Sequence, residues 1–72
     1  MKYMFIWDYN TGNLLKKVPL PKAVDKSISY EVEYIGGTRY LVVRDYYDNK
    51  ILHKINVEKY GSIEFEPKYL DE

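Results

Sequence analysis

The chain has 72 residues and no cysteine, so we expect one small domain over residues 1–72 without disulfides or thiolate-bound metal. Its 11 basic and 11 acidic residues cancel, which weighs against a protein that binds nucleic acid mainly through phosphates. There is no apolar run of about 18 residues and no signal-peptide core near the start, which predicts a cytoplasmic protein without a membrane span. Frequent Lys and Glu and the absence of Gln are a tendency of thermophilic proteins.

Six strands are predicted in chain order, at about residues 2–9, 13–20, 27–35, 39–46, 50–57 and 62–66, from short runs of β-branched and aromatic residues. One three-residue loop joins the first and second strands, and another joins the fourth and fifth strands. Gly12 is the third residue of the first loop and Asn49 is the third residue of the second. We expect both residues to adopt the left-handed conformation. Gly36 and Gly37 predict a two-residue primed turn. Residues 22–27 and 68–72 are each expected to form one short turn.

Two parts of the chain resemble each other. With an offset of 37 residues, Asp8 falls on Asp45 and Leu15 on Leu52; with an offset of 35, SISYE from Ser27 falls on SIEFE from Ser62. We therefore predict an internal duplication, with repeats over about 3–35 and 40–70, each forming a three-stranded antiparallel meander. The predicted fold is all-β, with the two meanders arranged as a small six-stranded barrel or a bent sheet.

The turns also assign the two faces of the predicted sheet. The loop at 47–49 places Asp45 opposite Ile51 and Val43 opposite His53, and the Gly36–Gly37 turn places Val32 opposite Leu41. One face is then apolar throughout and is the predicted core. Its members are Met4, Ile6, Leu14, Val18, Leu20, Ile28, Tyr30, Val32, Leu41, Val43, Ile51, Ile55, Val57, Ile63 and Phe65.

The stretch WDYNTGNLL, residues 7–15, resembles one hairpin of a β-propeller blade of the WD-repeat type. The resemblance implies a blade-like hairpin, but a propeller needs at least about four blades of roughly 40 residues each. A local explanation accounts for the aspartate better. Asp8 and Asp45 each stand just before a turn, where a carboxylate accepts hydrogen bonds from the N–H groups of the loop.

The sequence holds no recognisable catalytic set. His53 is the one histidine, and no Ser or Thr lies in a nucleophile motif. Gly36–Gly37 joins two strands and does not open a helix, so it is not a phosphate-binding loop. We expect a protein that is not an enzyme and that uses no cofactor or metal.

An aromatic stripe is the most unusual feature. Tyr3, Phe5, Trp7 and Tyr9 alternate at strand spacing and point away from the predicted core. The predicted binding residues are Tyr3, Phe5, Trp7, Tyr9, Tyr40, Arg44 and Tyr46. We expect a non-catalytic protein-interaction module whose partner is itself, as a homodimer, or another protein, because Tyr, Trp and Arg dominate interface hot spots.

The alternative function is a small β-barrel that binds single-stranded nucleic acid. Bases stack on aromatic rings for about 1–3 kcal/mol each. The residues that could contact phosphates are Lys17, Lys54, Arg44 and Arg39. Glu31 and Glu33, on the same face of the neighbouring predicted strand, oppose this alternative because they repel phosphates.

Overall fold

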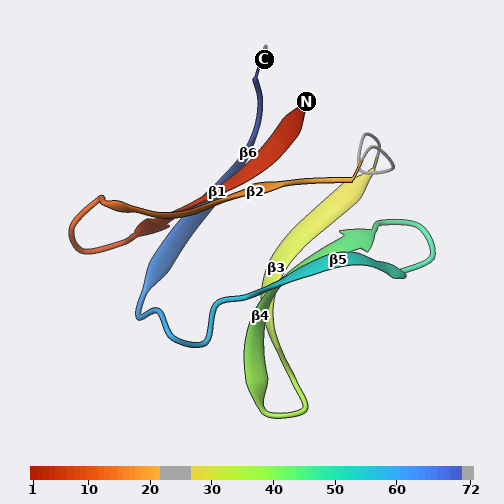
Figure 1. Cartoon of the computed structure of the whole chain (residues 1–72). Helices are drawn as coiled ribbons and strands as arrows, with labels where there is room; N and C mark the ends of the chain where they lie inside the picture. Colours follow the sequence, from red (N-terminus) through yellow and green to blue (C-terminus); the bar gives the residue numbers. More distant parts are fainter. Residues whose placement is uncertain (22–26, 71–72) are drawn as a thin grey trace. The chain divides into compact units, whose positions relative to one another are not determined.

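The computed structural model describes residues 1–21 and 27–70, which contain six β-strands and no helix (Figure 1). The strands are β1 (Lys2–Asp8), β2 (Leu14–Pro19), β3 (Ile28–Ile35), β4 (Thr38–Asp45), β5 (Ile51–Asn56) and β6 (Ile63–Tyr69). The all-β prediction is confirmed. Strand β6 runs past its predicted end to Tyr69, so a turn beginning at 68 is wrong, and residues 71–72 lie outside the described residues. The turn predicted for 22–27 also lies outside them, apart from Ser27.

The strands form two three-stranded antiparallel sheets, in the orders β2-β1-β6 and β3-β4-β5. The second sheet is a meander of consecutive strands, but neither sheet is one of the predicted meanders, which were expected to contain the first three and the last three strands. Neither sheet is closed, so the predicted barrel is not observed in the described residues. Contacts divide the chain into two units, residues 1–22 with 60–72 and residues 23–59, each with one sheet. No described helix is available to cross a membrane.

The β1–β2 and β4–β5 hairpins close with the same loop. In the first loop, the Asp8 N–H donates to the Asn13 carbonyl and the Gly12 N–H donates to the Asp8 carbonyl. In the second, the Asp45 N–H donates to the Lys50 carbonyl and the Asn49 N–H donates to the Asp45 carbonyl, both at 2.9 Å. Gly12 and Asn49 have φ of 75° and 63°, which confirms the predicted left-handed positions.

The repeated aspartates organise these loops, as the sequence predicts. Asp8 Oδ1 accepts hydrogen bonds from the N–H groups of Asn10 and Thr11, at 2.8 and 3.1 Å. Asp45 Oδ1 accepts them from Tyr47 and Asp48, at 2.8 and 3.4 Å. A carboxylate before a turn therefore satisfies two loop donors in each hairpin.

The loops are one residue longer than predicted, and each hairpin contains a bulge. The β1–β2 register shifts between Ile6 and Trp7, and the β4–β5 register shifts between Val43 and Arg44. Ile51 therefore pairs with Arg44, and the predicted pairing with Asp45 is wrong. Because a bulge adds one residue to one strand only, the residues beyond it change face.

The β3–β4 hairpin follows the prediction. Gly36 and Gly37 have φ of 59° and 84°, as a type I′ turn requires, and Ile35 pairs with Thr38 across it. The register places Val32 opposite Leu41 and Tyr30 opposite Val43, as predicted.

The buried apolar residues confirm about half of the predicted core. They are Met4, Ile6, Leu20, Leu41, Val42, Val43, Ile55 and Val57. Leu14 and Ile51 are 52% and 39% exposed, because each lies between the loop and the bulge of its hairpin and has left the core face. Val32 is 39% exposed on the edge strand β3, and Val42, which is absent from the predicted core, is buried.

The two sheets share their register residue by residue. The third strand of each predicted repeat lies beside the first strand of the other, β3 beside β4 and β6 beside β1. The equivalent pairs are Ile28–Asp45 and Ile63–Asp8, Tyr30–Val43 and Phe65–Ile6, and Val32–Leu41 and Pro67–Met4. Two backbone hydrogen bonds are also equivalent. The Tyr46 N–H donates to the Ser27 carbonyl as the Tyr9 N–H donates to the Ser62 carbonyl, and the Val57 N–H donates to the Arg39 carbonyl as the Leu20 N–H donates to the Lys2 carbonyl. Duplication stays a prediction, but the correspondence allows each position in one sheet to be compared with its equivalent in the other.

Candidate functional site

The predicted binding residues divide between the two units. Tyr3, Phe5, Trp7 and Tyr9 belong to the first unit, and Tyr40, Arg44 and Tyr46 belong to the second. The two groups are therefore two separate candidate surfaces.

The first surface is built on β1, the central strand of its sheet. Met4 and Ile6 are fully buried, so the alternation along the strand turns Tyr3, Phe5 and Trp7 to the opposite side. There the Phe5 and Trp7 rings stack, with centroids 5.8 Å apart and planes inclined by 16°. All three aromatic side chains are partly exposed. Tyr9 lies past the end of β1, in the loop, and is 58% exposed.

Two lysines lie over these rings. Lys17 Nζ on β2 is 4.5 Å from the centre of the Tyr3 ring and 5.9 Å from that of Phe5. Lys68 Nζ on β6 is 5.8 Å from the Phe5 centre and 5.5 Å from the Trp7 centre. An ammonium at this distance is attracted to the negative face of the ring. The sequence placed Lys68 in a terminal turn, so its role at this surface was missed.

Charges of both signs border the aromatic rings. Phe5 pairs with Lys17 on β2 and with Glu66 on β6, so a basic and an acidic residue flank it across the sheet. Trp7 pairs with Glu64 on β6. We call this surface, made of Tyr3, Phe5, Trp7, Lys17, Glu64, Glu66 and Lys68, the aromatic face. Its centre is aromatic and its β2 flank carries Lys17. Its β6 flank carries Glu64, Glu66 and Lys68, and Lys68 Nζ lies 3.9 Å from a carboxylate oxygen of Glu66.

The second sheet repeats part of this arrangement. Lys54 Nζ lies 4.7 Å from the centre of the Tyr40 ring, in the same relation as Lys17 and Tyr3. Val42 stands where the first sheet has Phe5, and it too is paired with a lysine and a glutamate, Lys54 and Glu31. Val42 is only 1% exposed, however, so this surface has no accessible apolar centre.

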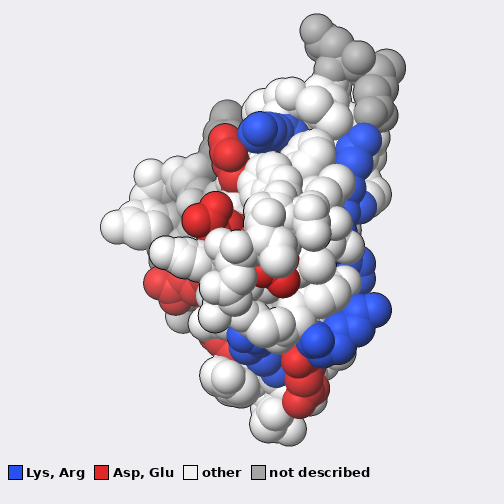
Figure 2. Space-filling model, turned by 90° about the vertical axis from the view of Figure 1, so that its left-hand side faces the viewer, with Lys and Arg blue, Asp and Glu red and all other residues white. Residues whose placement is uncertain are grey.

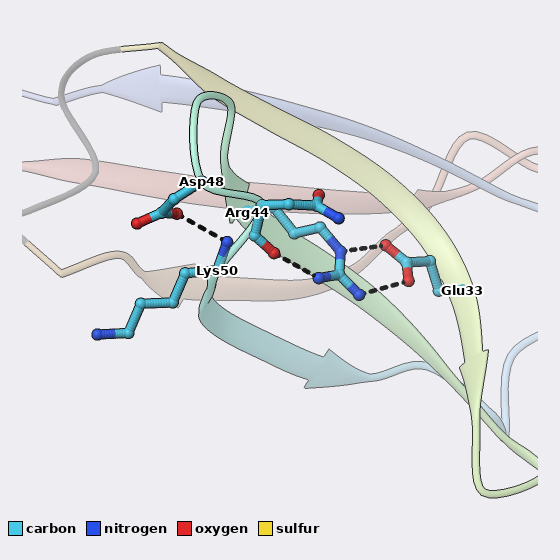
Figure 3. A network of polar contacts seen from close by, with 5 residues as sticks. Glu33, Arg44, Asp48 and Lys50 are labelled. Carbon is cyan, nitrogen blue, oxygen red and sulfur yellow. Dashed lines mark hydrogen bonds and ion pairs between the residues drawn. The ribbon is translucent and has the colours of Figure 1, made fainter.

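Arg44 and Glu33 replace Trp7 and Lys68 at the equivalent positions. Arg44 Nε and one terminal nitrogen donate to the two carboxylate oxygens of Glu33, at 2.8 and 2.9 Å. The other terminal nitrogen donates to the Asn49 carbonyl at 2.7 Å, so Arg44 joins β3 to the β4–β5 loop (Figure 3). The hydrogen bonds from Arg44, opposed by partial burial, lower the pKa of the Glu33 carboxyl.

A shallow polar depression of about 400 Å³ lies beside this ion pair. It is lined by Ser29, Glu31, Glu33, Arg44, Tyr46 and Asn49, all from the second unit. Tyr46 is 70% exposed. The depression was not predicted, because it depends on the diagonal reach of Arg44 across the strands.

The remaining candidate groups are His53 and the acidic side chains. His53 is partly buried opposite Val43, and no group of three or more His, Cys, Asp or Glu side chains in the described residues could hold a metal ion. Figure 2 shows basic and acidic side chains on one face with uncharged surface between them.

A scan against family models and searches of curated proteins and of solved structures found no match.

Proposed function

We propose that this protein is a non-catalytic interaction module that associates with a second copy of itself through the aromatic face. The observation that carries the proposal is the stacked, partly exposed pair of Phe5 and Trp7 on the side of β1 opposite the buried Met4 and Ile6. Aromatic side chains bury a large area, and Trp is enriched among the few residues that dominate the binding energy of protein interfaces.

The flanking charges favour a second copy as the partner. A two-fold axis parallel to β1 would set the two faces against each other, with β2 of one copy over β6 of the other. Lys17 and Glu66 stand on opposite sides of Phe5, so each Lys17 would face the partner copy's glutamate and each glutamate its lysine. This arrangement would form two Lys17–Glu66 contacts between the copies, in addition to the Lys68–Glu66 ion pair within each copy, and would bring the aromatic rings together.

The size of the chain supports the same conclusion. A chain of 72 residues without disulfides buries only about 60% of its unfolded surface, so such domains often gain stability from association. The second sheet is less suited to this role, because Val42 is buried where the first sheet presents Phe5.

The test is the mass in solution of the wild type and the Trp7→Glu variant, by sedimentation equilibrium. The wild type should show a dimer at about 100 μM, and Trp7→Glu should be monomeric, because it places a charge against an apolar surface. Tyr47→Glu is the matched control: Tyr47 is 83% exposed in the other unit, so the variant should associate like the wild type. A wild type that is monomeric at about 100 μM contradicts the proposal.

Single-stranded nucleic acid is a second candidate ligand, favoured by the lysines beside the aromatic rings. Stacking of a base on Phe5 or Trp7 requires Lys17 or Lys68 to leave the ring, and Glu64 and Glu66 repel the phosphates. We therefore expect no binding of a short oligonucleotide at about 150 mM salt. Trp7 is the sole tryptophan, so its fluorescence reports binding. Micromolar, salt-sensitive quenching of Trp7 would favour this candidate instead.

A further inference from the structure

The edge strands of the two sheets differ in proline. Pro19 lies in β2 and Pro67 in β6, the two edges of the first sheet, whereas β3 and β5, the edges of the second, contain none. A proline in an edge strand removes a backbone donor and so hinders the addition of another strand. The second sheet lacks this protection.

The equivalence of the sheets shows how the β3 backbone is oriented. Pro67 pairs with Met4 as Val32 pairs with Leu41. Because proline has no N–H to give to the ladder, its nitrogen must face the free edge of β6. The Val32 N–H therefore faces the free edge of β3. Val32 is 39% and Tyr34 73% exposed, and Glu31 is exposed, so this part of the strand is open to solvent.

The depression next to β3 carries a net negative charge. Its ionic side chains are Glu31, Glu33 and Arg44. Arg44 donates to both oxygens of Glu33 and to the Asn49 carbonyl, whereas Glu31 makes no ion pair with any residue that the structure describes. The exposed ring of Tyr46 borders the same depression and can attract a cation through its face.

We infer that β3 binds an extended basic peptide segment of another protein by strand addition, with a Lys or Arg side chain lying over the depression. The peptide backbone would pair with the free edge at Val32, and alternate side chains would fall on the side of Glu31 and Glu33. This surface belongs to the second unit and is distinct from the aromatic face.

A second copy is a poor occupant of this edge. Antiparallel pairing of two β3 strands about Val32 would set Glu31 directly opposite Glu33 of the other copy. Like charges in directly opposite positions destabilise a strand pair. A strand with basic residues at those positions would instead be attracted to Glu31 and Glu33.

The experiment measures binding of a blocked peptide that alternates lysine and threonine, by titration calorimetry. We expect binding that Glu31→Gln weakens several-fold and makes less sensitive to salt. Val32→Pro should weaken binding by about tenfold or more while leaving the fold intact, because β6 accommodates Pro67 at the same position. Trp7→Glu should bind the peptide like the wild type.

A variant of the peptide removes any dependence on the folding of Val32→Pro. Two versions of the basic peptide are methylated on alternate backbone amides. The first version carries the methyl groups on the lysine amides and the second carries them on the threonine amides, so only one of them blocks the amides that face β3. One version should lose binding and the other should keep it. Equal binding by both versions, equal binding of a glutamate–threonine peptide, or no binding of the basic peptide would overturn the inference.

Discussion

The two leucines near the ends of β2 should respond very differently to truncation. Leu20 is 2% exposed and its N–H donates to the Lys2 carbonyl at 2.9 Å, whereas Leu14 is 52% exposed beyond the bulge. Leu20→Ala leaves a cavity and should cost about 2–4 kcal/mol. Leu14→Ala removes atoms that are half in water, so its cost should stay below about 1 kcal/mol.

These differences are large relative to the expected stability of the chain. At about 0.05–0.15 kcal/mol per residue, the free energy of unfolding is about 4–11 kcal/mol. For a chain of this size, about 3 kcal/mol corresponds to a fall of about 12–24 °C in Tm. Thermal melts followed by circular dichroism distinguish the two variants easily. Equal losses for Leu14→Ala and Leu20→Ala would refute the bulge and the face assignment that depends on it.

Two further predictions concern the loops and the ion pair. Gly12→Val and Asn49→Val should each lower stability by about 1–3 kcal/mol, because both sites have positive φ, while Asn49→Gly should be neutral or slightly stabilising in the same melts. The folded-state pKa of Glu33 is lowered chiefly by its hydrogen bonds from Arg44, so the stability from this pair is complete above the ordinary pKa of about 4.3 and is lost as pH falls through the folded value. Urea midpoints from pH 7 to about 3 should therefore fall less steeply for Glu33→Gln than for the wild type, and equal slopes would contradict this assignment.

Local patterns in the sequence predicted the strands and turns well. The alternation of apolar residues and the positions of Gly12, Asn49 and the Gly36–Gly37 pair depend on neighbours in the chain. They therefore identified the six strands, the left-handed residues and the β3–β4 register. Asp8 and Asp45 were correctly interpreted as turn residues for the same reason.

The pairing of distant strands could not be predicted in the same way. The alternation of apolar and polar residues is the same whether β3 and β6 pair within their own predicted repeat or lie beside the first strand of the other repeat. Only tertiary contacts decide that β6 lies beside β1. The extra loop residue moved Leu14 and Ile51 out of the core, although both fit the apolar pattern. Lys68 reaches the aromatic face because β6 continues to Tyr69, past the end that the sequence indicated.

The central proposal is that the aromatic face of one copy contacts the aromatic face of a second copy. NMR spectra recorded over a dilution series test it most directly. Amide shifts recorded from about 500 μM down to about 20 μM span the range in which weak dimers dissociate. We predict shifts concentrated at Tyr3, Phe5, Trp7, Lys17 and Glu66, with little change around Tyr47 in the second unit. Shifts that are independent of concentration, or that are confined to the second unit, would contradict the proposal.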